Sequence, residues 1–209
     1  ETATLLGDKN AKIIVCHLGN GSSVSAVKDG KCQDTSMGFT PLEGLVMGTR
    51  SGDIDPAAVE FMRVKLGLSP EEVVNYLNKK CGMLGISGFS SDMRDNTEAM
   101  LNGNERAKLA IEMVAYRVKK YVGSYIAVLG GVDAIVFTGG IGEHSFRVRE
   151  MVMDGMEYCG AKLDKKKNEE YGSDVGYINT EDSKVKIIVL PTNEELSIAR
   201  ETKELTENK

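Results

Sequence analysis

A short turn after an apolar run constrains this chain more than any other feature. The turn reads His17-Leu18-Gly19-Asn20-Gly21-Ser22-Ser23 and follows the apolar residues 13–15, with Cys16 between them. An apolar β-branched run that enters a glycine-containing turn, and then alternates, predicts strand, tight turn and strand. The two glycines leave the backbone open to a ligand, and the asparagine and serines add hydrogen-bonding groups. Two interpretations follow, an ordinary β-hairpin or a turn that holds a polyphosphate, and they are compatible.

Composition narrows the class of protein. A chain of 209 residues suits one large domain or two small ones, and 41% apolar residues can form a sizeable core. The net charge of -5 argues against nucleic acid or an acidic membrane surface as a partner. Four scattered cysteines without a C-x-x-C pair predict reduced thiols in a cytoplasmic protein. The sequence predicts no membrane span and no signal peptide, and its start at Glu1 predicts a piece of a longer protein.

The spacing of apolar residues predicts alternating strands and helices. Three antiparallel strands in succession are expected near residues 13–18, 24–28 and 31–36, and buried or final strands at 133–137 and 185–190. Helices are expected at residues 56–66, 70–81, 107–129, from about 145 onward, and 194–205, several of them with cap residues at their ends. Residues 82–89 are expected to form a glycine-rich loop and 162–170 a solvated surface segment.

A long glycine-rich passage without a clear period covers residues 37–53. Its apolar content argues against disorder, so a functional loop is expected. Arg50 lies there between small residues, in Gly48-Thr49-Arg50-Ser51-Gly52. Arginine suits the charge of a transferring phosphoryl group. The alternative is a surface arginine paired with Asp53 or Asp55.

A second glycine-rich stretch follows the buried strand at residues 133–137. It reads Thr138-Gly139-Gly140-Ile141-Gly142-Glu143-His144-Ser145. Strand, glycine-rich turn and helix place a nucleotide at the carboxyl end of a strand, beside a helix N-terminus. The spacing matches neither the dinucleotide fingerprint nor a Walker A loop. His144 is either a general base or a loop histidine that bonds the backbone, and the second interpretation is the simpler.

Two further sites have both a structural and a functional interpretation. Asp92 and Arg94 begin a predicted helix, where Asp92 can act as the cap or both can bond a ribose or base edge. Glu194 begins the last predicted helix, where an acidic residue favours the helix dipole. Its functional interpretation is a carboxylate near a metal–nucleotide, directly or through water.

Five stretches together resemble the acetate kinase family. They are His17-Leu18-Gly19-Asn20-Gly21-Ser22-Ser23, Asp34-Thr35-Ser36-Met37-Gly38-Phe39-Thr40-Pro41-Leu42-Glu43-Gly44, Met47-Gly48-Thr49-Arg50-Ser51-Gly52-Asp53, Phe137-Thr138-Gly139-Gly140-Ile141-Gly142-Glu143 and Pro191-Thr192-Asn193-Glu194-Glu195. The resemblance covers nearly the whole chain but only the second half of such a protein.

The resemblance implies an α/β domain of the actin-like ATPase (ribonuclease H-like) fold, a central mixed sheet with an antiparallel meander flanked by helices. Residues 1–209 would be the C-terminal nucleotide-binding domain of a two-domain acyl kinase, with ATP in the cleft between two related halves. The implied substrates are ATP or ADP and a short-chain carboxylate, with Mg²⁺, in a cytoplasmic homodimer. The first half's phosphate turn, acyl-pocket arginine, catalytic aspartate and stabilising histidine have no counterpart here.

The resemblance also assigns site residues. Arg50 would stabilise the transferring phosphoryl group, and Glu194 would help hold Mg²⁺. The residues that would contact the nucleotide are His17, Leu18, Gly19, Asn20 and Gly21 at the phosphates, Asp92, Met93 and Arg94 at the nucleoside, and Gly140, Ile141, Gly142, Glu143 and His144 along the adenosine and phosphate pocket. The family often has asparagine in place of His144, which weakens a role for it as a base.

Two classes of function are therefore expected. In the first, the parent enzyme transfers phosphate between ATP and acetate by direct displacement, or uses propionate or butyrate instead. No enzyme nucleophile is needed for that reaction. In the second, the chain is a nucleotide-binding or dimerisation module without catalysis. We expect the 209-residue chain alone to be inactive as a kinase, because half the substrate cleft would be missing.

Overall fold

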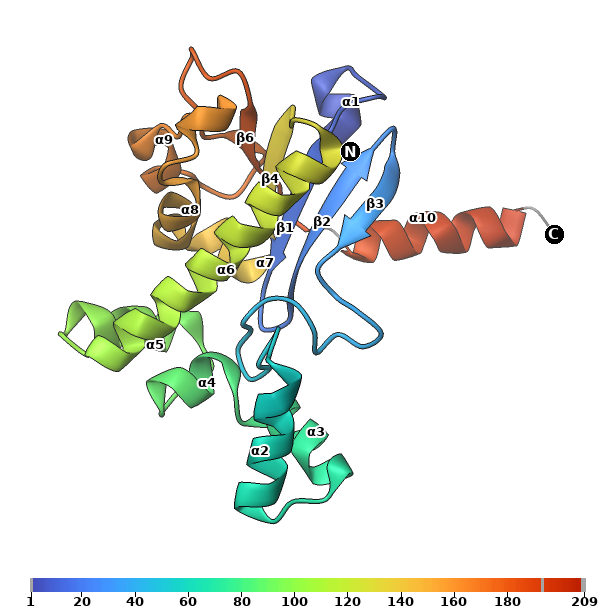
Figure 1. Ribbon diagram of the computed structural model, residues 1–209. Helices are drawn as coiled ribbons and strands as arrows, with labels where there is room; N and C mark the ends of the chain where they lie inside the picture. Colours follow the sequence, from blue (N-terminus) through green and yellow to red (C-terminus); the bar gives the residue numbers. More distant parts are fainter. Residues whose placement is uncertain (1, 193, 208–209) are drawn as a thin grey trace.

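The computed structural model describes residues 2–192 and 194–207, and only part of the side chains of the last helix (Figure 1). Its centre is a six-stranded sheet in the order β3-β2-β1-β4-β6-β5. The strands are β1 (Ile13–Leu18), β2 (Ser22–Lys28), β3 (Lys31–Thr35), β4 (Ala134–Thr138), β5 (Gly176–Tyr177) and β6 (Lys186–Val189). The helices are α1 (Thr2–Leu6), α2 (Pro56–Leu66), α3 (Pro70–Lys79), α4 (Gly82–Ser87), α5 (Met93–Leu101), α6 (Glu105–Leu129), α7 (Gly139–His144), α8 (Phe146–Met153), the 3₁₀ turn η1 (Glu157–Cys159), α9 (Lys165–Glu169) and α10 (Glu194–Glu207).

Strand β1 lies in the middle of the sheet, with an antiparallel neighbour on one side and a parallel neighbour on the other. It pairs antiparallel with β2, which pairs antiparallel with β3, so the predicted meander is confirmed. On its other side it pairs parallel with β4, and β4 pairs parallel with β6. The fully apolar run of β4 is buried, as expected for a strand covered on both faces. The short edge strand β5 was not predicted, because a two-residue strand leaves no periodic pattern.

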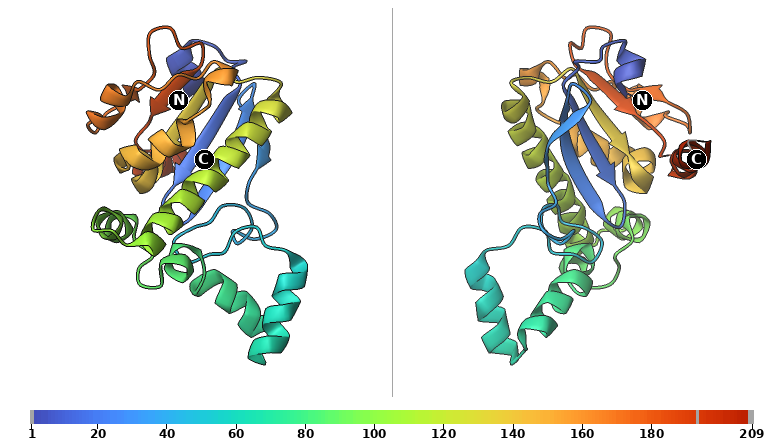
Figure 2. Two further views of the ribbon diagram at one scale, coloured as in Figure 1. Left: turned by 60° about the vertical axis from the view of Figure 1, so that its left-hand side comes forward. Right: turned by 90° about the vertical axis from the view of Figure 1, so that its right-hand side faces the viewer.

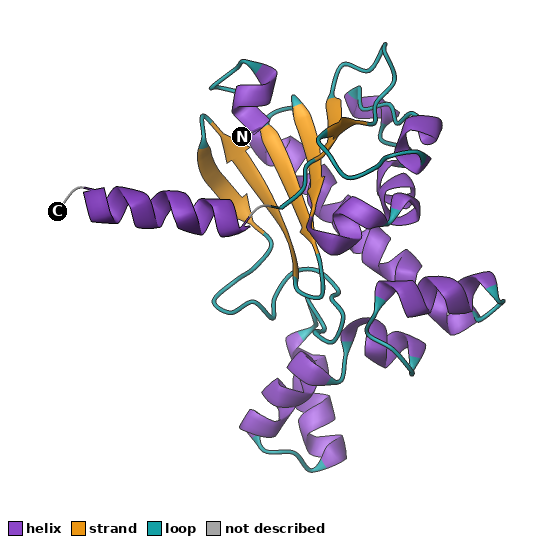
Figure 3. Ribbon diagram, turned by 180° about the vertical axis from the view of Figure 1, so that it is seen from behind, coloured by secondary structure: helices purple, strands orange, loops and turns teal. Residues whose placement is uncertain are grey.

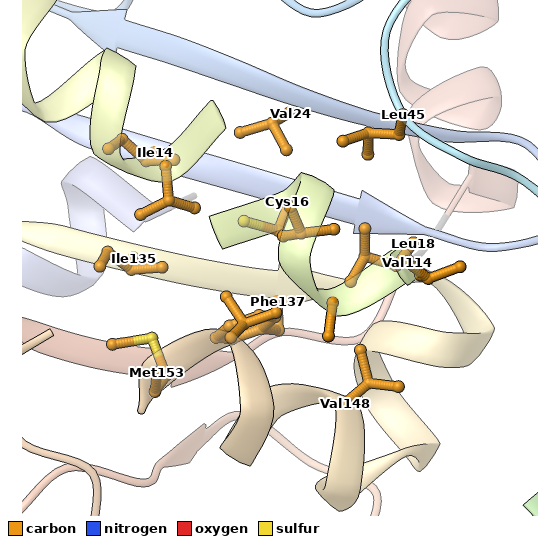
Figure 4. Close-up of a cluster of buried hydrophobic side chains, with 14 of the residues drawn as sticks. Ile14, Cys16, Leu18, Val24, Leu45, Val114, Ile135, Phe137, Val148 and Met153 are labelled. Carbon is orange, nitrogen blue, oxygen red and sulfur yellow. The ribbon is translucent and has the colours of Figure 1, made fainter. Parts of the chain in front are cut away.

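Helices cover both faces of the sheet, and most of the core lies on one of them. Helix α6 runs across that face, and α8 packs beside it (Figures 1 and 2). Figure 4 shows side chains of the central strands meeting those of α6 and α8, among them Ile14, Phe137, Val114 and Val148. Cys16 is buried in this cluster, and burial raises the pKa of its thiol, so it is a packing residue as its apolar surroundings predict. Helix α1 packs on the opposite face through Ala3.

Helices α2 and α3 form a hairpin that projects from the rest of the domain (Figure 2). Their ends match the sequence: Asp55 caps α2, Ser69 and Glu72 form a capping box on α3, and Gly67 adopts φ +66°. Val74 of α3 is 52% exposed, whereas Val73 and Leu77 are buried. Helix α10 extends away from the sheet (Figure 3). None of the described helices is long and apolar enough to cross a membrane.

Two segments differ from the expectation. Residues 82–89 contain the helix α4 instead of a continuous loop. The helix after β4 begins at Gly139, as α7, and Ser145 separates it from α8, so the predicted glycine-rich turn is itself helical. The charged run at residues 162–170 is a surface segment as predicted, because Lys165–Lys167, Glu169 and Glu170 are exposed, although it holds the short helix α9 and its Asn168 is buried. For α4 and α7, contacts made elsewhere in the fold outweigh the local sequence preference.

Candidate functional site

The two glycine-rich stretches meet at the end of the sheet where the central strands β1 and β4 terminate. Because β1 and β4 are parallel and His17 pairs with Thr138, the turns that follow the two strands emerge side by side. They open into a cavity of about 790 Å³. The residues that line it are Gly19, Asn20, Ser91, Asp92, Met93, Arg94, Thr97, Glu98, Leu101, Gly140, Ile141, His144, Ser145, Phe146 and Arg147. Exposed backbone and cationic side chains suit an anion, and the apolar side chains suit a flat ring.

The first turn is closed by its own hydrogen bonds. Gly19 N–H donates to the Gly21 carbonyl at 3.1 Å and to Ser22 Oγ at 3.2 Å, and Ser22 Oγ donates back to the Gly19 carbonyl at 2.9 Å. Gly48, from the long loop at residues 37–53, donates its N–H to the Asn20 carbonyl at 3.1 Å. A Cβ on Gly48 would lie 2.0 Å from Asn20 Oδ1, so a side chain at this position would displace the Asn20 amide. The long loop therefore braces the turn at the cavity.

The second stretch presents one glycine to the protein and the next to the cavity. Gly139 has φ +77°, and a Cβ there would lie 2.7 Å from the Leu18 carbonyl oxygen. A Cβ on Gly140 would meet no described atom within 4 Å, and Gly140 lines the cavity. Gly142 is buried against β1 and β4 and is not part of the lining. The backbone at Gly140 is thus the part of α7 that a ligand can approach closely.

Glu143 joins the second stretch to the segment after β6. Its Oε1 accepts the N–H groups of Gly139 at 2.9 Å and Thr192 at 3.1 Å, and the Thr192 hydroxyl at 3.3 Å. Glu143 does not line the cavity, although it was predicted at the nucleotide pocket. His144, the next residue, is exposed and does line it.

A buried arginine that sequence reasoning missed holds the other end of α7. Arg149 is 1% exposed and donates to the carbonyls of Gly142 at 2.8 Å, Glu143 at 2.7 Å and Asn168 at 2.9 Å, and to Asn168 Oδ1 at 2.7 Å. Its guanidinium also lies over the Tyr171 ring at 5.3 Å. Burial lowers the pKa of Arg149 to about 10, which still leaves it charged at neutral pH. A positive charge at the carboxyl end of a helix is favourable.

Asp92 and Arg94 lie on the cavity wall and bond each other. Asp92 caps α5 by accepting the Arg94 N–H at 2.7 Å, and it also accepts from the Arg94 guanidinium at 2.7 and 3.1 Å. These bonds lower the pKa of Asp92 to about 2. The predicted cap is therefore confirmed, and both residues still border the cavity. The lining also includes Thr97, Glu98 and Leu101, which follow on α5 at helical spacing and were not predicted.

Arg50 adjoins the first turn but lines a neighbouring hollow. A Cβ built on Gly21 would lie 3.2 Å from Arg50 Nη1. The same Nη1 group donates to the Pro41 carbonyl at 3.4 Å. The hollow beside it measures about 800 Å³ and is shared with α3. Among the described ion pairs none joins Arg50 to Asp53 or Asp55, so the predicted surface pairing is wrong.

The remaining predicted residues lie further from the cavity. Leu18 is buried in the core, and His17, half-buried at the end of β1, is not part of the lining. Glu194 begins α10, but its side chain lies outside the described residues. Within residues 2–192 and 194–207, no group of three or more histidine, cysteine, aspartate or glutamate side chains is placed to hold a metal ion.

The mixed sheet, its antiparallel meander and the flanking helices define an α/β domain of the actin-like ATPase fold. The sequence profile of the Acetokinase family matches residues 1–200, and the chain belongs to that family. It is 60% identical over 211 residues to the acetate kinase of Thermotoga maritima, a match that covers 99% of this chain and 52% of that protein. The acetate kinase of Clostridium botulinum is 58% identical over 198 residues, covering 95% and 50%.

Solved structures agree with this assignment. The crystal structure of Porphyromonas gingivalis acetate kinase superimposes with a TM-score of 0.95 at 47% identity, covering 98% of this chain and 52% of that one. A propionate kinase from Francisella tularensis superimposes with a TM-score of 0.88, also at 47% identity, covering 95% and 50%. The chain spans about half the length of the curated relatives it matches.

Proposed function

We propose that the full-length protein transfers a phosphoryl group between ATP and acetate, and that this chain is its C-terminal nucleotide-binding domain. Membership of the Acetokinase family supports the reaction, and the roughly half-length match supports a second domain. In that reaction a carboxylate oxygen of acetate attacks the terminal phosphorus of ATP, and the bond from that phosphorus to ADP breaks. The products are acetyl phosphate and ADP, and the reaction is reversible.

The cavity between the two glycine-rich stretches is the observation that carries this proposal. Backbone at Gly19 and Gly140 opens into it without a side chain, which suits the close approach of phosphates. Ile141, Leu101 and Phe146 give it an apolar wall for the base. The nucleotide would lie between these two parts of the lining, with Asp92 to Arg94 near the nucleoside.

Arg50 is proposed to stabilise the transferring phosphoryl group. A charged guanidinium beside the phosphate turn would offset the negative charge that spreads over the group during transfer. Its place in the neighbouring hollow suits this role, because the terminal phosphate and the acyl substrate must meet beyond the nucleotide's own cavity. No nucleophile from the protein takes part in this direct displacement.

Mg²⁺ is proposed to arrive with the nucleotide. Mg²⁺ keeps several waters and is commonly held by substrate phosphates and one or two carboxylates. Glu194 is the carboxylate we propose near the metal, and when bound the ion would neutralise phosphate charge. We also propose a cytoplasmic homodimer, on the family resemblance alone.

A propionate kinase activity is the second candidate. The Francisella propionate kinase is as similar in sequence to this chain as the Porphyromonas acetate kinase, at 47% each. Comparing kcat/KM for acetate, propionate and butyrate in the full-length protein separates the two, because acyl chain length decides between them.

The central test measures acetyl phosphate formation by the full-length protein and its Arg50→Ala variant. We expect a loss of at least about 100-fold in kcat while the affinity for ATP is retained, since arginines that act on the transferred group contribute factors of this size or larger. Arg63→Ala is the control, because Arg63 pairs with Glu60 on the exposed surface of α2. Activity that survives Arg50→Ala would remove the proposed role. ATP binding without any turnover would favour the non-catalytic module, and no binding at millimolar ATP would favour assembly alone.

A further inference from the structure

A polar cluster outside the cavity fastens the long loop to the core helix α6. Tyr121 donates its hydroxyl to Asp53 Oδ2 at 2.9 Å, and Arg117 donates to the Asp53 carbonyl at 2.8 Å and to Oδ2 at 3.5 Å. Arg117 and Tyr121 are four positions apart on α6, so they share one face of the helix. Burial, and then the bond to Asp53, raise the pKa of Tyr121 to about 12, so the hydroxyl remains a donor at neutral pH.

Asp53 also closes the loop that carries Arg50. Its Oδ1 accepts the Gly44 N–H at 2.9 Å, and its own N–H donates to the Gly44 carbonyl at 3.0 Å. Gly44 has φ +107°, and a Cβ there would lie 2.3 Å from the Ser36 carbonyl oxygen, so the closure needs glycine. Residues 44–53 thus form a loop whose two ends meet at one carboxylate, three residues from Arg50.

Arg50 itself has only weak direct anchors among the described residues. Its guanidinium donates to the Pro41 carbonyl at 3.4 Å and approaches Met47 Sδ at 3.8 Å. The backbone on either side is held more firmly, since Ser51 N–H donates to the Leu77 carbonyl at 3.0 Å. The placement of the guanidinium is therefore decided by how the loop is fixed, and much less by bonds to the guanidinium.

We propose that Asp53, Tyr121 and Arg117 are positioning residues for Arg50, acting through the loop that Asp53 closes. This inference rests on the proposed role of Arg50 in phosphoryl transfer. None of the three lines the nucleotide cavity. Their loss therefore lowers the rate of transfer more than it lowers nucleotide affinity, because a displacement of the catalytic group alone affects only the step in which that group acts.

Tyr121→Phe in the full-length protein is the mildest test. It removes one hydroxyl and keeps the ring, which packs edge-on against Tyr125 at 5.7 Å. We expect kcat for acetyl phosphate formation to fall about tenfold, with KM for ATP within about twofold of the wild type. Tyr116→Phe is the matched control: it lies on the same helix, is 62% exposed, and contacts Lys120 instead of the loop.

A double variant separates positioning from a general structural role. If Tyr121 acts through Arg50, Tyr121→Phe should cause no further loss in an Arg50→Ala background. Asp53→Asn, which keeps one acceptor oxygen, should lower kcat in the same way in the wild-type background. An equal loss with and without Arg50, or an unchanged kcat in Tyr121→Phe, would overturn the inference. An inactive wild type would instead overturn the proposed function on which it rests.

Discussion

The carboxylate of Glu143 accepts the backbone N–H of Thr192 at 3.1 Å, across 49 positions of the chain. The same oxygen accepts the N–H of Gly139, the first residue of α7. One side chain thus links the glycine-rich stretch after β4 to the segment after β6. Both segments carry residues that we propose at the nucleotide and its metal, so their relative placement depends on Glu143.

Removing that carboxylate should destabilise the fold. Glu143→Ala removes three hydrogen bonds to one carboxylate oxygen, although the Gly139 N–H keeps the Thr192 hydroxyl at 3.1 Å as an acceptor, and we expect the free energy of unfolding to fall by about 2 kcal/mol. Glu143→Gln should lose less than about 1 kcal/mol, because all three bonds go to one oxygen that an amide also supplies. Urea unfolding measures both. Glu157→Ala, an exposed glutamate, is the control, and similar losses in Ala and Gln variants would contradict the assignment.

Two neighbouring glycines should respond in opposite ways to alanine. Gly139→Ala places a Cβ at φ +77°, 2.7 Å from the Leu18 carbonyl, and should destabilise the protein by more than about 1 kcal/mol. Gly140→Ala meets no described atom, so stability should stay the same or rise by up to about 1 kcal/mol. Its methyl group would occupy the cavity, so ATP affinity should fall. Thermal unfolding and ATP titration check the pair, and full ATP affinity in Gly140→Ala would argue against phosphate contact there.

Arg149 should matter for stability far more than its neighbour Arg147. Arg149→Met leaves four acceptor oxygens without their donors inside the protein, and we expect a loss of about 3 kcal/mol. Arg147→Met on the same helix removes, among the described residues, a contact with the Phe146 ring at 4.4 Å, and should cost less than about 1 kcal/mol. Chemical denaturation of both variants tests this. Equal losses would show that the buried network does not carry the stability of α7.

The Asp92–Arg94 pair predicts a dependence on acid pH. Bonds from Arg94 lower the pKa of Asp92 to about 2 from its ordinary value of 3.8. The charged carboxylate therefore stabilises the folded protein fully at pH values above 3.8. This contribution should fade as the pH falls from 3.8 toward 2. Asp92→Asn keeps an oxygen for the cap and lacks the charge, so its stability should converge with that of the wild type in acid. The difference is small, because solvent screens an exposed pair. A constant difference across this range would contradict the assigned cause.

The sequence predicts some elements well because their signals are local. The ends of α2 and α3 depend on Asp55, Ser69 and Gly67, each of which bonds residues within one turn. The antiparallel pairing of β1, β2 and β3 also follows, because strands joined by short turns fold back on their neighbours. These features need no information from distant parts of the chain.

Other elements depend on partners far away in the sequence. Helix α7 contains three glycines, so its local preference is for a turn, but Glu143, Thr192 and Arg149 bond its two ends. Cys81 precedes helix α4 but its side chain does not cap it, and the N-terminal N–H groups of α4 bond the long loop instead, as Met83 does with the Met47 carbonyl at 2.8 Å. Neither helix could be predicted from spacing alone.

The candidate site also has residues that could be predicted from the sequence and residues that could not. The glycine turns and Arg50 could be found because unusual small residues surround them. The α5 wall could not, since Thr97 and Leu101 look like ordinary helix residues until α5 is placed beside the turns. Arg149 was equally hidden: nothing in its neighbours distinguishes a buried arginine from an exposed one.

The parallel register of β1 and β4 decides where this chain can accept extra residues. One residue inserted within β4 would turn the following side chains to the opposite face, taking Phe137 out of the core and shifting Gly139 from Leu18. The tip of the hairpin between α2 and α3 is different, because Gly67 and Ser69 are exposed there and the hairpin projects from the rest of the domain (Figure 2). A fluorescent label or affinity tag therefore belongs at that tip, where it would report on the protein without disturbing its fold.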